Sequence, residues 1–361
     1  MIKRISWLLI GIMMLLSACT ASGIASGYTK YSYECIGAFD TVIQFIGYTK
    51  SQEEFETLAK LGETRFYELN KLYDIYHDYE GINNIKTIND YAGIRPVEVR
   101  QEIIDLILFS KEWHEKTGGI VNIALGPVLN VWHEYREAGL DNPEKAKVPS
   151  MEELLEANRY TDINEVIVDV ANKTVFLSDP HMRLDVGAVA KGYATEIVAD
   201  ELEAKGYTSF IISSGGNVRI VGKPLDGGRS KWGIGIQDPG TDPNKADAPT
   251  IDTVYTDKGS VVTSGDYQRY YTVDGKVYHH LIDPSSLFPG NYYRSVTVMT
   301  EDSGVADFLS STLFLLPFEE SRKLAESLPD VEALWIMSDG TIHATEGMKK
   351  VLKNLGGATS Q

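Results

Sequence analysis

The sequence predicts a mixed α/β or α+β protein, and two observations indicate this class. Apolar residues recur at helical spacing in some segments and in short strand-like runs in others, with no regular alternation between the two. No internal repeat or low-complexity block follows residue 27. A chain of 361 residues is also long enough to bury a large core without disulfides or metals.

The N-terminus has the layout of a bacterial lipoprotein signal. Lys3 and Arg4 precede an apolar stretch over residues 7–16, which is too short to span a bilayer because a spanning helix needs about 20 residues. The stretch ends in Leu-Ser-Ala-Cys, which resembles a lipobox. We therefore expect a lipoprotein signal peptide over residues 1–18 and a lipid on Cys19. The alternative is an ordinary cleaved signal followed by a chance cysteine.

The expected lipid on Cys19 implies a location for the protein, and the sequence after it indicates the bounds of the tether and of the folded domain. We expect it to be anchored in the cell membrane, on the extracytoplasmic face. Small residues follow the cysteine and bury nothing, so residues 19–30 are expected to form the lipidated, flexible tether. The folded domain is expected over residues 31–355, with a short tail over residues 356–361.

The first half of the folded part should contain a strand, two helices and a hairpin. A strand is expected over residues 41–46 and an amphipathic helix over 52–73. A second helix over 99–116 should end at a Gly-Gly pair. Two short β-branched runs around a polar turn predict a β-hairpin over 165–178.

The second half repeats the mixture. A helix over residues 191–205 should lead into a strand over 209–212 and a glycine-rich turn. Residues 238–249 are rich in Pro, Asp and Lys and are expected to form an exposed loop. The last predicted elements are a strand over 295–299, a helix over 305–316 and a strand over 333–337.

Charge and cysteine content exclude several classes of protein. The net charge of −17 argues against nucleic acid or anionic lipid as the main partner, since both favour Lys and Arg. It leaves carboxylates available for a hard cation. Apart from Cys19 the only cysteine is Cys35, so an acylated Cys19 leaves no intramolecular disulfide. The sequence has no GxSxG, HExxH or CxxC motif, which removes the commonest hydrolase, zinc-protease and thioredoxin interpretations.

Three short patterns could carry chemistry, although each alone is also compatible with a structural role. Residues 185–192 form a small-residue turn with Lys191 at a helix start, which suits a phosphate, but they lack P-loop spacing. Asp307 and Ser311 lie four apart on a predicted helix, so both oxygens could reach one Mg²⁺. His279 and His280 precede an Asp-Pro turn, and histidine is the side chain best suited to abstract a proton near neutral pH.

Taken together and in order, the motifs resemble the ApbE family over about residues 36–340. They are Phe39-Asp40-Thr41, residues 122–127, residues 185–192, residues 214–217, Thr263-Ser264-Gly265, residues 280–284 and residues 306–311. That family comprises FAD:protein FMN transferases, which are often lipoproteins. The agreement of several motifs in one order is more specific than any one of them.

The resemblance implies a fold, a reaction and a set of partners. The fold would be α+β of the T-fold-like type, with mixed sheets and packed helices in a single catalytic unit. The enzyme would be Mg²⁺-dependent, and would move FMN from FAD to a Thr or Ser hydroxyl of exported or membrane redox proteins, with release of AMP. Its partners would be FAD, acceptor flavoproteins of the cell envelope that take part in electron transfer, and the membrane through the lipid anchor, but no nucleic acid.

The same resemblance implies particular site residues. The metal would be held by the Ala188 carbonyl, Asp307 and the Ser311 hydroxyl, and His280 is our candidate base for the acceptor hydroxyl. The FAD site would be lined by Phe39, Tyr76, Asn122, Ile123, Ala124, Asp185, Lys191 and Leu281.

The sequence departs from the family pattern at two places, and it leaves two alternative functions open. The family usually has Thr at the position of Ser311, and it commonly shows Thr-Gly where this chain has residues 285–288. An FAD pyrophosphatase, which would use water in place of the protein hydroxyl, has the same metal and diphosphate requirements. A non-catalytic FAD-binding lipoprotein is the alternative from another class.

Overall fold

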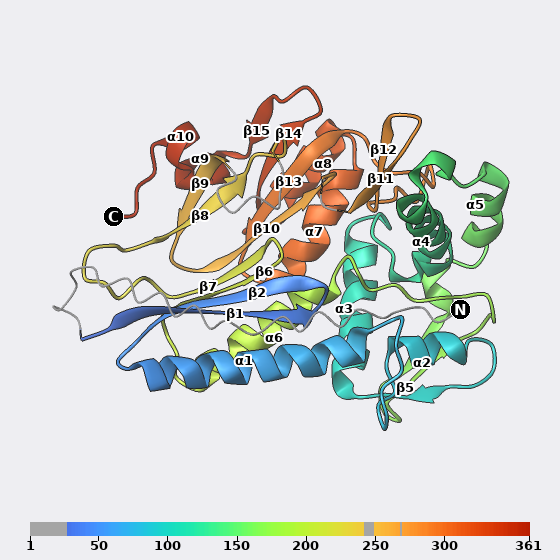
Figure 1. Cartoon of the computed structure of the whole chain (residues 1–361), viewed down its shortest axis with the longest axis horizontal. Helices are drawn as coiled ribbons and strands as arrows, with labels where there is room; N and C mark the ends of the chain where they lie inside the picture. The colour runs from blue at the N-terminus through green and yellow to red at the C-terminus, as the bar shows by residue number, and fades with distance from the viewer. Residues whose placement is uncertain (1–26, 242–248, 268) are drawn as a thin grey trace, which may run out of the picture.

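The computed structural model describes residues 27–241, 249–267 and 269–361 (Figure 1). The predicted signal peptide, Cys19, most of the tether and the middle of the predicted loop at 238–249 lie outside the described residues. Within the described part of the chain, no helix is both long enough and apolar enough to cross a membrane.

The fold is built on an eight-stranded sheet in which every neighbouring pair is antiparallel. An all-antiparallel sheet needs no crossover helices, so its helices pack on its faces without alternating with its strands. The strands, in spatial order, are β1 (Thr29–Ala38), β2 (Thr41–Thr49), β6 (Phe210–Ser214), β7 (Asn217–Val221), β10 (Gly259–Gly265), β13 (Tyr293–Thr300), β14 (Glu332–Met337) and β15 (Ile342–Ala344). The α+β prediction is therefore confirmed.

Alternate residues of each strand separate two hydrophobic layers. On one face Phe45, Val262 and Trp335 pack toward helices α1 (Gln52–Tyr73), α6 (Ala190–Ala204), α7 (Ser303–Leu315) and α8 (Phe318–Ser327). On the other face Val261 and Leu334 pack toward β8 (Trp232–Gln237), β9 (Thr250–Thr256), α9 (Glu346–Val351) and α10 (Lys353–Gly356). In Figure 1, α1 runs along one side of β1 and β2, and β8, β9 and α10 lie on the opposite side.

A mostly helical region adjoins one end of the sheet, on the right of Figure 1. It contains α2 (Ile85–Asp90), α3 (Gln101–Lys116), α4 (Gly126–Asp141) and α5 (Met151–Asn158). A small sheet has the order β3 (Val97–Glu98), β5 (Thr174–Leu177), β4 (Val166–Asp169), and the hairpin β11 (Tyr270–Val273) and β12 (Lys276–His279) packs on α4. The site described below lies where this region meets the sheet.

The predicted elements are present, with shifts at their ends. The helix over residues 52–73 has the predicted bounds, and β4 and β5 form the predicted hairpin. Helix α7 starts at Ser303, two residues earlier than predicted, because the Asp302 side chain caps it by accepting the Val305 N–H.

Both ends of the predicted domain carry further structure. Strand β1 was not predicted; it starts at Thr29, so Thr29 and Lys30 pair with β2. Near the C-terminus, the Ser360 carbonyl accepts N–H groups from Ser230 and Lys231 at 2.8 and 3.1 Å, which fixes the last residues to the fold.

Candidate active site

The first part of the candidate site lies where the start of helix α6 contacts the turn between β6 and β7. Lys191, on the first turn of α6, donates from Nζ to the Gly215 carbonyl at 3.1 Å. Gly215 has a φ of +53°, and a Cβ there would lie 2.2 Å from Thr41 Oγ1. Only glycine therefore allows the tip of the β1–β2 hairpin to approach this turn so closely. The contact brings three distant parts of the sequence to one end of the sheet.

Asp307 lies beside Lys191 because α6 and α7 approach each other closely. The Gly192 N–H donates to Asp307 Oδ2 at 2.7 Å. A Cβ on Gly192 would lie 2.3 Å from the Ser303 carbonyl oxygen and 2.4 Å from Asp307 Cβ, so this crossing requires glycine. Burial raises the pKa of Asp307 and lowers that of Lys191, and the opposite charge of each partner counteracts both shifts.

The start of α7 is held by a partly buried ion pair. Glu196 on α6 accepts the Ser303 N–H at 2.6 Å and pairs with Arg219 on β7 at 2.9 Å. Burial raises the pKa of Glu196 to about 7, although the Arg219 charge and the Ser303 N–H both favour its ionised form. These contacts fix the register of the helix that carries Asp307.

A cluster of hydroxyl groups lies one turn beyond Asp307. Ser311 is buried, and its Oγ lies 3.4 Å from Ser264 Oγ on β10, which is also 2.8 Å from Ser310 Oγ. Thr312 points elsewhere and donates to the Phe308 carbonyl at 2.9 Å. Ser311 thus lies in a group of hydroxyls with Ser264, which the sequence analysis named only as part of the Thr263-Ser264-Gly265 motif.

Asp307 and Ser311, both buried and one turn apart on α7, carry oxygen atoms of the kind that a hard cation prefers. No group of three or more Asp, Glu, His or Cys side chains that could hold a metal occurs in the described part of the chain, so a cation here would have one carboxylate with neutral oxygens. Mg²⁺ accepts such a set when substrate phosphates and water complete its shell. Asn217 on β7 is fully buried. Its amide lies near enough to favour the ionised form of Asp307.

Residues 122–124 and Asp185 form a second part of the site. Asn122 caps a short 3₁₀ turn by accepting the Ala124 N–H at 2.8 Å, and it donates to the Thr161 carbonyl at 2.8 Å. The Ile123 carbonyl accepts the Asp185 N–H at 2.8 Å. Burial raises the pKa of the Asp185 carboxyl, while the Gly187 N–H acts to lower it. The structure therefore brings four of the predicted FAD-site residues together.

Phe39 and Tyr76 supply aromatic rings near the same end of the sheet. Phe39 has a φ of +54°, and its N–H donates to Asn70 Oδ1 at 2.7 Å, which holds the tip of the hairpin. The Tyr76 ring lies 5.2 Å from the His133 ring, and 47% of Tyr76 is exposed. A partly exposed ring held by a neighbour is suited to contact a planar ligand.

The two adjacent histidines have different surroundings. His279 uses both ring nitrogens within the fold: Nε2 donates to the Gly290 carbonyl at 2.7 Å, and Nδ1 accepts the Leu281 N–H at 3.2 Å. His280 uses only Nδ1, which lies 3.3 Å from the Arg269 carbonyl. A proton on Nδ1 leaves the Nε2 lone pair of His280 available. Burial lowers the pKa of His280 to about 3, with further contributions from the charges of Arg269 and His279, so the ring is neutral.

The loop after the histidines closes without the glycine that the family commonly has there. Leu287 adopts a φ of +61°, its N–H donates to the Asp283 carbonyl at 2.7 Å, and its own carbonyl accepts Trp132 Nε1–H at 2.8 Å. Burial of the Leu287 side chain and the bond to Trp132 hold a conformation that costs about 1 kcal/mol for a residue other than glycine.

The chain is an α+β protein whose candidate site, at one end of an antiparallel sheet, holds a buried carboxylate, a partly buried lysine and a histidine with one free ring nitrogen. The chain belongs to the ApbE family, because the model of that family matches residues 39–335.

Relatives and solved structures agree with this assignment. An FAD:protein FMN transferase of Klebsiella pneumoniae (strain 342) is 33% identical over 282 residues, which cover 77% of this chain and 83% of that protein. One from Treponema pallidum (strain Nichols) is 33% identical over 277 residues, or 73% of each chain. The crystal structure of the ApbE protein from Thermotoga maritima has a TM-score of 0.75 at 30% identity, and covers 90% of this chain and 99% of that one. The flavin transferase ApbE from Vibrio cholerae shares the fold, with a TM-score of 0.71 at 22% identity.

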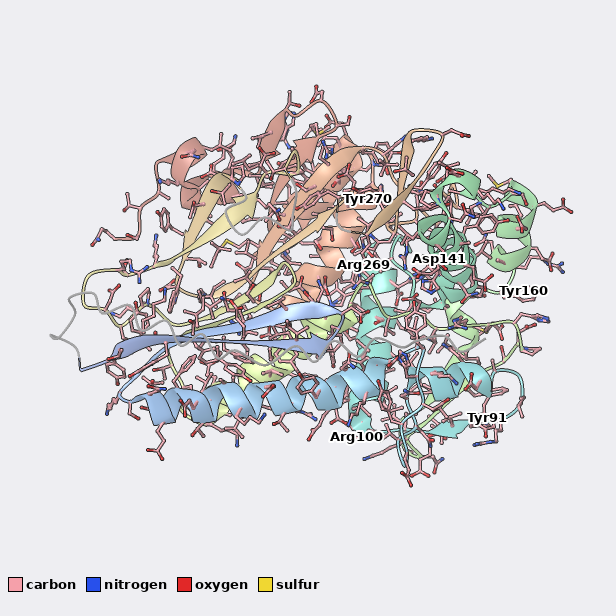
Figure 2. All side chains as sticks on the ribbon, in the orientation of Figure 1. Tyr91, Arg100, Asp141, Tyr160, Arg269 and Tyr270 are labelled. Carbon is pink, nitrogen blue, oxygen red and sulfur yellow. The ribbon has the colours of Figure 1, made fainter. Side chains whose placement is uncertain are left out.

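The predictions of the family, of the α+β fold and of an enzyme are therefore confirmed. The ligand-binding roles of the predicted residues stay predictions, and the structure shows how those residues are placed. Arg269 is labelled in Figure 2, and its positive charge acts to lower the pKa of Tyr76, Asp185, Lys191 and His280. Ser264, Asn217 and Arg269 were not singled out. Ser264 and Asn217 lie inside predicted motifs, whereas no sequence signal marked Arg269.

Proposed function

We propose that this chain is an FAD:protein FMN transferase that attaches FMN to a Thr or Ser hydroxyl of another protein and releases AMP. The observation that carries the proposal is the pairing of Lys191 with the buried Asp307 where α6 and α7 cross, with His280 keeping a free Nε2 in the motif that follows β12. Family membership and relatives that bear this name support it.

The residues of this chain suit each part of that reaction. The acceptor hydroxyl oxygen would attack the phosphorus of the FMN half of FAD, and the bond from that phosphorus to the bridging oxygen would break, so that AMP leaves. The hydroxyl proton would pass to His280 Nε2, and the Lys191 charge would stabilise the diphosphate. The positive charges that lower the pKa of His280 would be offset by a bound diphosphate, which would make the ring a stronger base when the substrate is present.

The proposed cofactor is Mg²⁺, held by the Ala188 carbonyl, Asp307 and the Ser311 hydroxyl. When bound, it would neutralise charge on the diphosphate oxygens. The support is the buried Asp307 carboxylate, with the buried Ser311 hydroxyl one turn further along α7. Ser311 supplies the hydroxyl for which the family usually has Thr.

We further propose that the protein acts at the membrane surface on acceptor flavoproteins of the cell envelope. This part of the proposal comes from the sequence, which has a lipobox-like segment ending at Cys19. A lipid on Cys19 would confine enzyme and acceptor to one surface and raise their effective concentration.

The test is to incubate the chain with FAD, Mg²⁺ and an acceptor domain that another FMN transferase labels. The proposal expects flavin fluorescence on the acceptor band after denaturing electrophoresis, and none with His280→Ala. An unlabelled acceptor, with free FMN formed at a rate that acceptor does not change, would instead identify an FAD pyrophosphatase. Bound FAD that stays intact would identify a binding protein.

A further inference from the structure

Arg269 is tied to the candidate base through its backbone. It immediately precedes β11, and its carbonyl accepts the His280 N–H at 3.1 Å and lies 3.3 Å from His280 Nδ1. The Arg269 backbone therefore fixes both the position of the histidine ring and which of its nitrogens is free. The residue itself is exposed, so its guanidinium is accessible to a ligand.

The Arg269 guanidinium has no anionic partner in the described part of the chain. Two other arginines that act on the site are already occupied: Arg136 contacts His133 and Glu137, and Arg183 donates to the Ile75 carbonyl. Arg269 forms no ion pair or side-chain hydrogen bond with any described residue. Most of the arginines in the described residues instead pair with a carboxylate.

The charge of Arg269 acts on the centre of the site. Burial is the main influence on the pKa of Asp185, Lys191 and His280, and the Arg269 charge acts to lower the pKa of all three. The positive charge of Arg269 therefore disfavours the charged form of Lys191. A dianionic group bound between two such cations would offset this effect and gain from both.

We propose that Arg269 binds the diphosphate of FAD, as a second cationic contact beside Lys191. The proposal rests on the proposed function, because it takes FAD as the ligand. A guanidinium suits this role better than an ammonium group, since its planar fork can donate two parallel hydrogen bonds to phosphate oxygens.

In this arrangement Arg269 positions both the base and the phosphate that react. The Arg269 carbonyl holds His280, and the Arg269 guanidinium holds the phosphate that the acceptor attacks. The distance between base and phosphorus is then set by a single residue. Such alignment lowers the barrier by reducing the freedom of the reacting groups before the step occurs.

The test compares Arg269→Gln and Arg269→Lys with the unaltered chain. Both variants keep the backbone carbonyl that orients His280, so they change only the side chain. Dissociation constants are measured for FAD and for riboflavin, which has no phosphate, in EDTA without acceptor so that FAD is not consumed. We expect Arg269→Gln to weaken FAD binding about tenfold to a hundredfold and Arg269→Lys to weaken it less, with riboflavin binding unchanged.

Arg159→Gln is the matched control, because Arg159 is an exposed arginine paired with Glu156 on α5, and it should bind both ligands normally. An unchanged FAD dissociation constant in Arg269→Gln would overturn the proposal. An equal loss for FAD and riboflavin, with a lower melting temperature, would also overturn it by showing a structural role. The measurement involves no transfer step. A chain that never labels an acceptor would therefore refute the proposed function and leave this comparison interpretable.

Discussion

At the residue scale, the adjacent His279 and His280 differ in how many of their ring nitrogens form hydrogen bonds, and only His280 keeps a nitrogen that could act as a base. Both rings lie near the Asp-Pro turn, and only the position of carbonyl and N–H partners distinguishes them. The sequence located the pair and named His280 as the candidate base, but it could not reveal that His279 has no free nitrogen. That assignment depends on Gly290 and Leu281, whose positions follow from the closure of the loop.

The pH dependence of stability offers a test of the lowered pKa of His280. Its pKa in the folded chain is about 3, against 6.5 for an unperturbed histidine. Between these values the unfolded chain binds the proton and the folded chain does not, so stability falls as the pH is lowered from 6.5 toward 3. We expect the free energy of unfolding, measured by urea denaturation at several pH values, to fall less steeply in His280→Gln. Equal slopes in the two proteins would contradict a depressed pKa.

Asp307→Asn separates metal binding from folding. The amide keeps an acceptor for the Gly192 N–H but has no charge, so a cation loses its one carboxylate. We expect calorimetry to detect no Mg²⁺ binding in the presence of FAD, while the free energy of unfolding changes by only about 1 kcal/mol. Mg²⁺ binding as tight as in the unaltered chain would rule out Asp307 as a ligand.

At the element scale, the crossing of α6 and α7 places Lys191 and Asp307 side by side. The sequence predicted both helices, because their apolar residues have helical spacing and their boundaries carry turn residues. It could not predict the crossing, which depends on Gly192 having no side chain where the two helices approach. The same limit applies to β1, whose residues alternate between a helix-facing and a solvent-facing side at an edge of the sheet, with too few apolar positions to predict a strand.

Gly192→Ala should disrupt this crossing. The added Cβ would meet backbone and side-chain atoms at 2.3–2.4 Å, which forces the helices apart and weakens the bond to Asp307. We expect a loss of about 2 kcal/mol in the free energy of unfolding, together with weaker Mg²⁺-dependent FAD binding. Gly228→Ala is the control, since its Cβ would have only Asp226 Oδ1 nearby, at 3.9 Å. Similar stability of the two variants would show that the crossing tolerates a side chain.

At the scale of the whole molecule, the antiparallel sheet gathers motifs that are far apart in the sequence. The tip of the β1–β2 hairpin, the β6–β7 turn and the end of β10 all lie at the end of the sheet that faces the helical region (Figure 1). The order of motifs in the sequence predicted the family and its α+β fold. The position of Arg269 depends on how the β11–β12 hairpin packs on α4, which no local pattern encodes.

The anchor can be tested on the whole protein in cells. Cys19→Ala removes the predicted lipid and leaves every residue of the site unchanged. We expect equal rates of acceptor labelling by the purified forms, and lower labelling of membrane acceptors in cells that express the variant, because tethering raises the effective concentration. Equal labelling in cells would show that the anchor is dispensable.

The measurement that tests the central claim most directly is the ratio of AMP released to flavin attached to the acceptor. If the chain transfers FMN, AMP and protein-bound flavin should form in equal amounts, and both should disappear in His280→Ala while FAD still binds. Release of AMP with free FMN in solution and no flavin on a competent acceptor would contradict the claim.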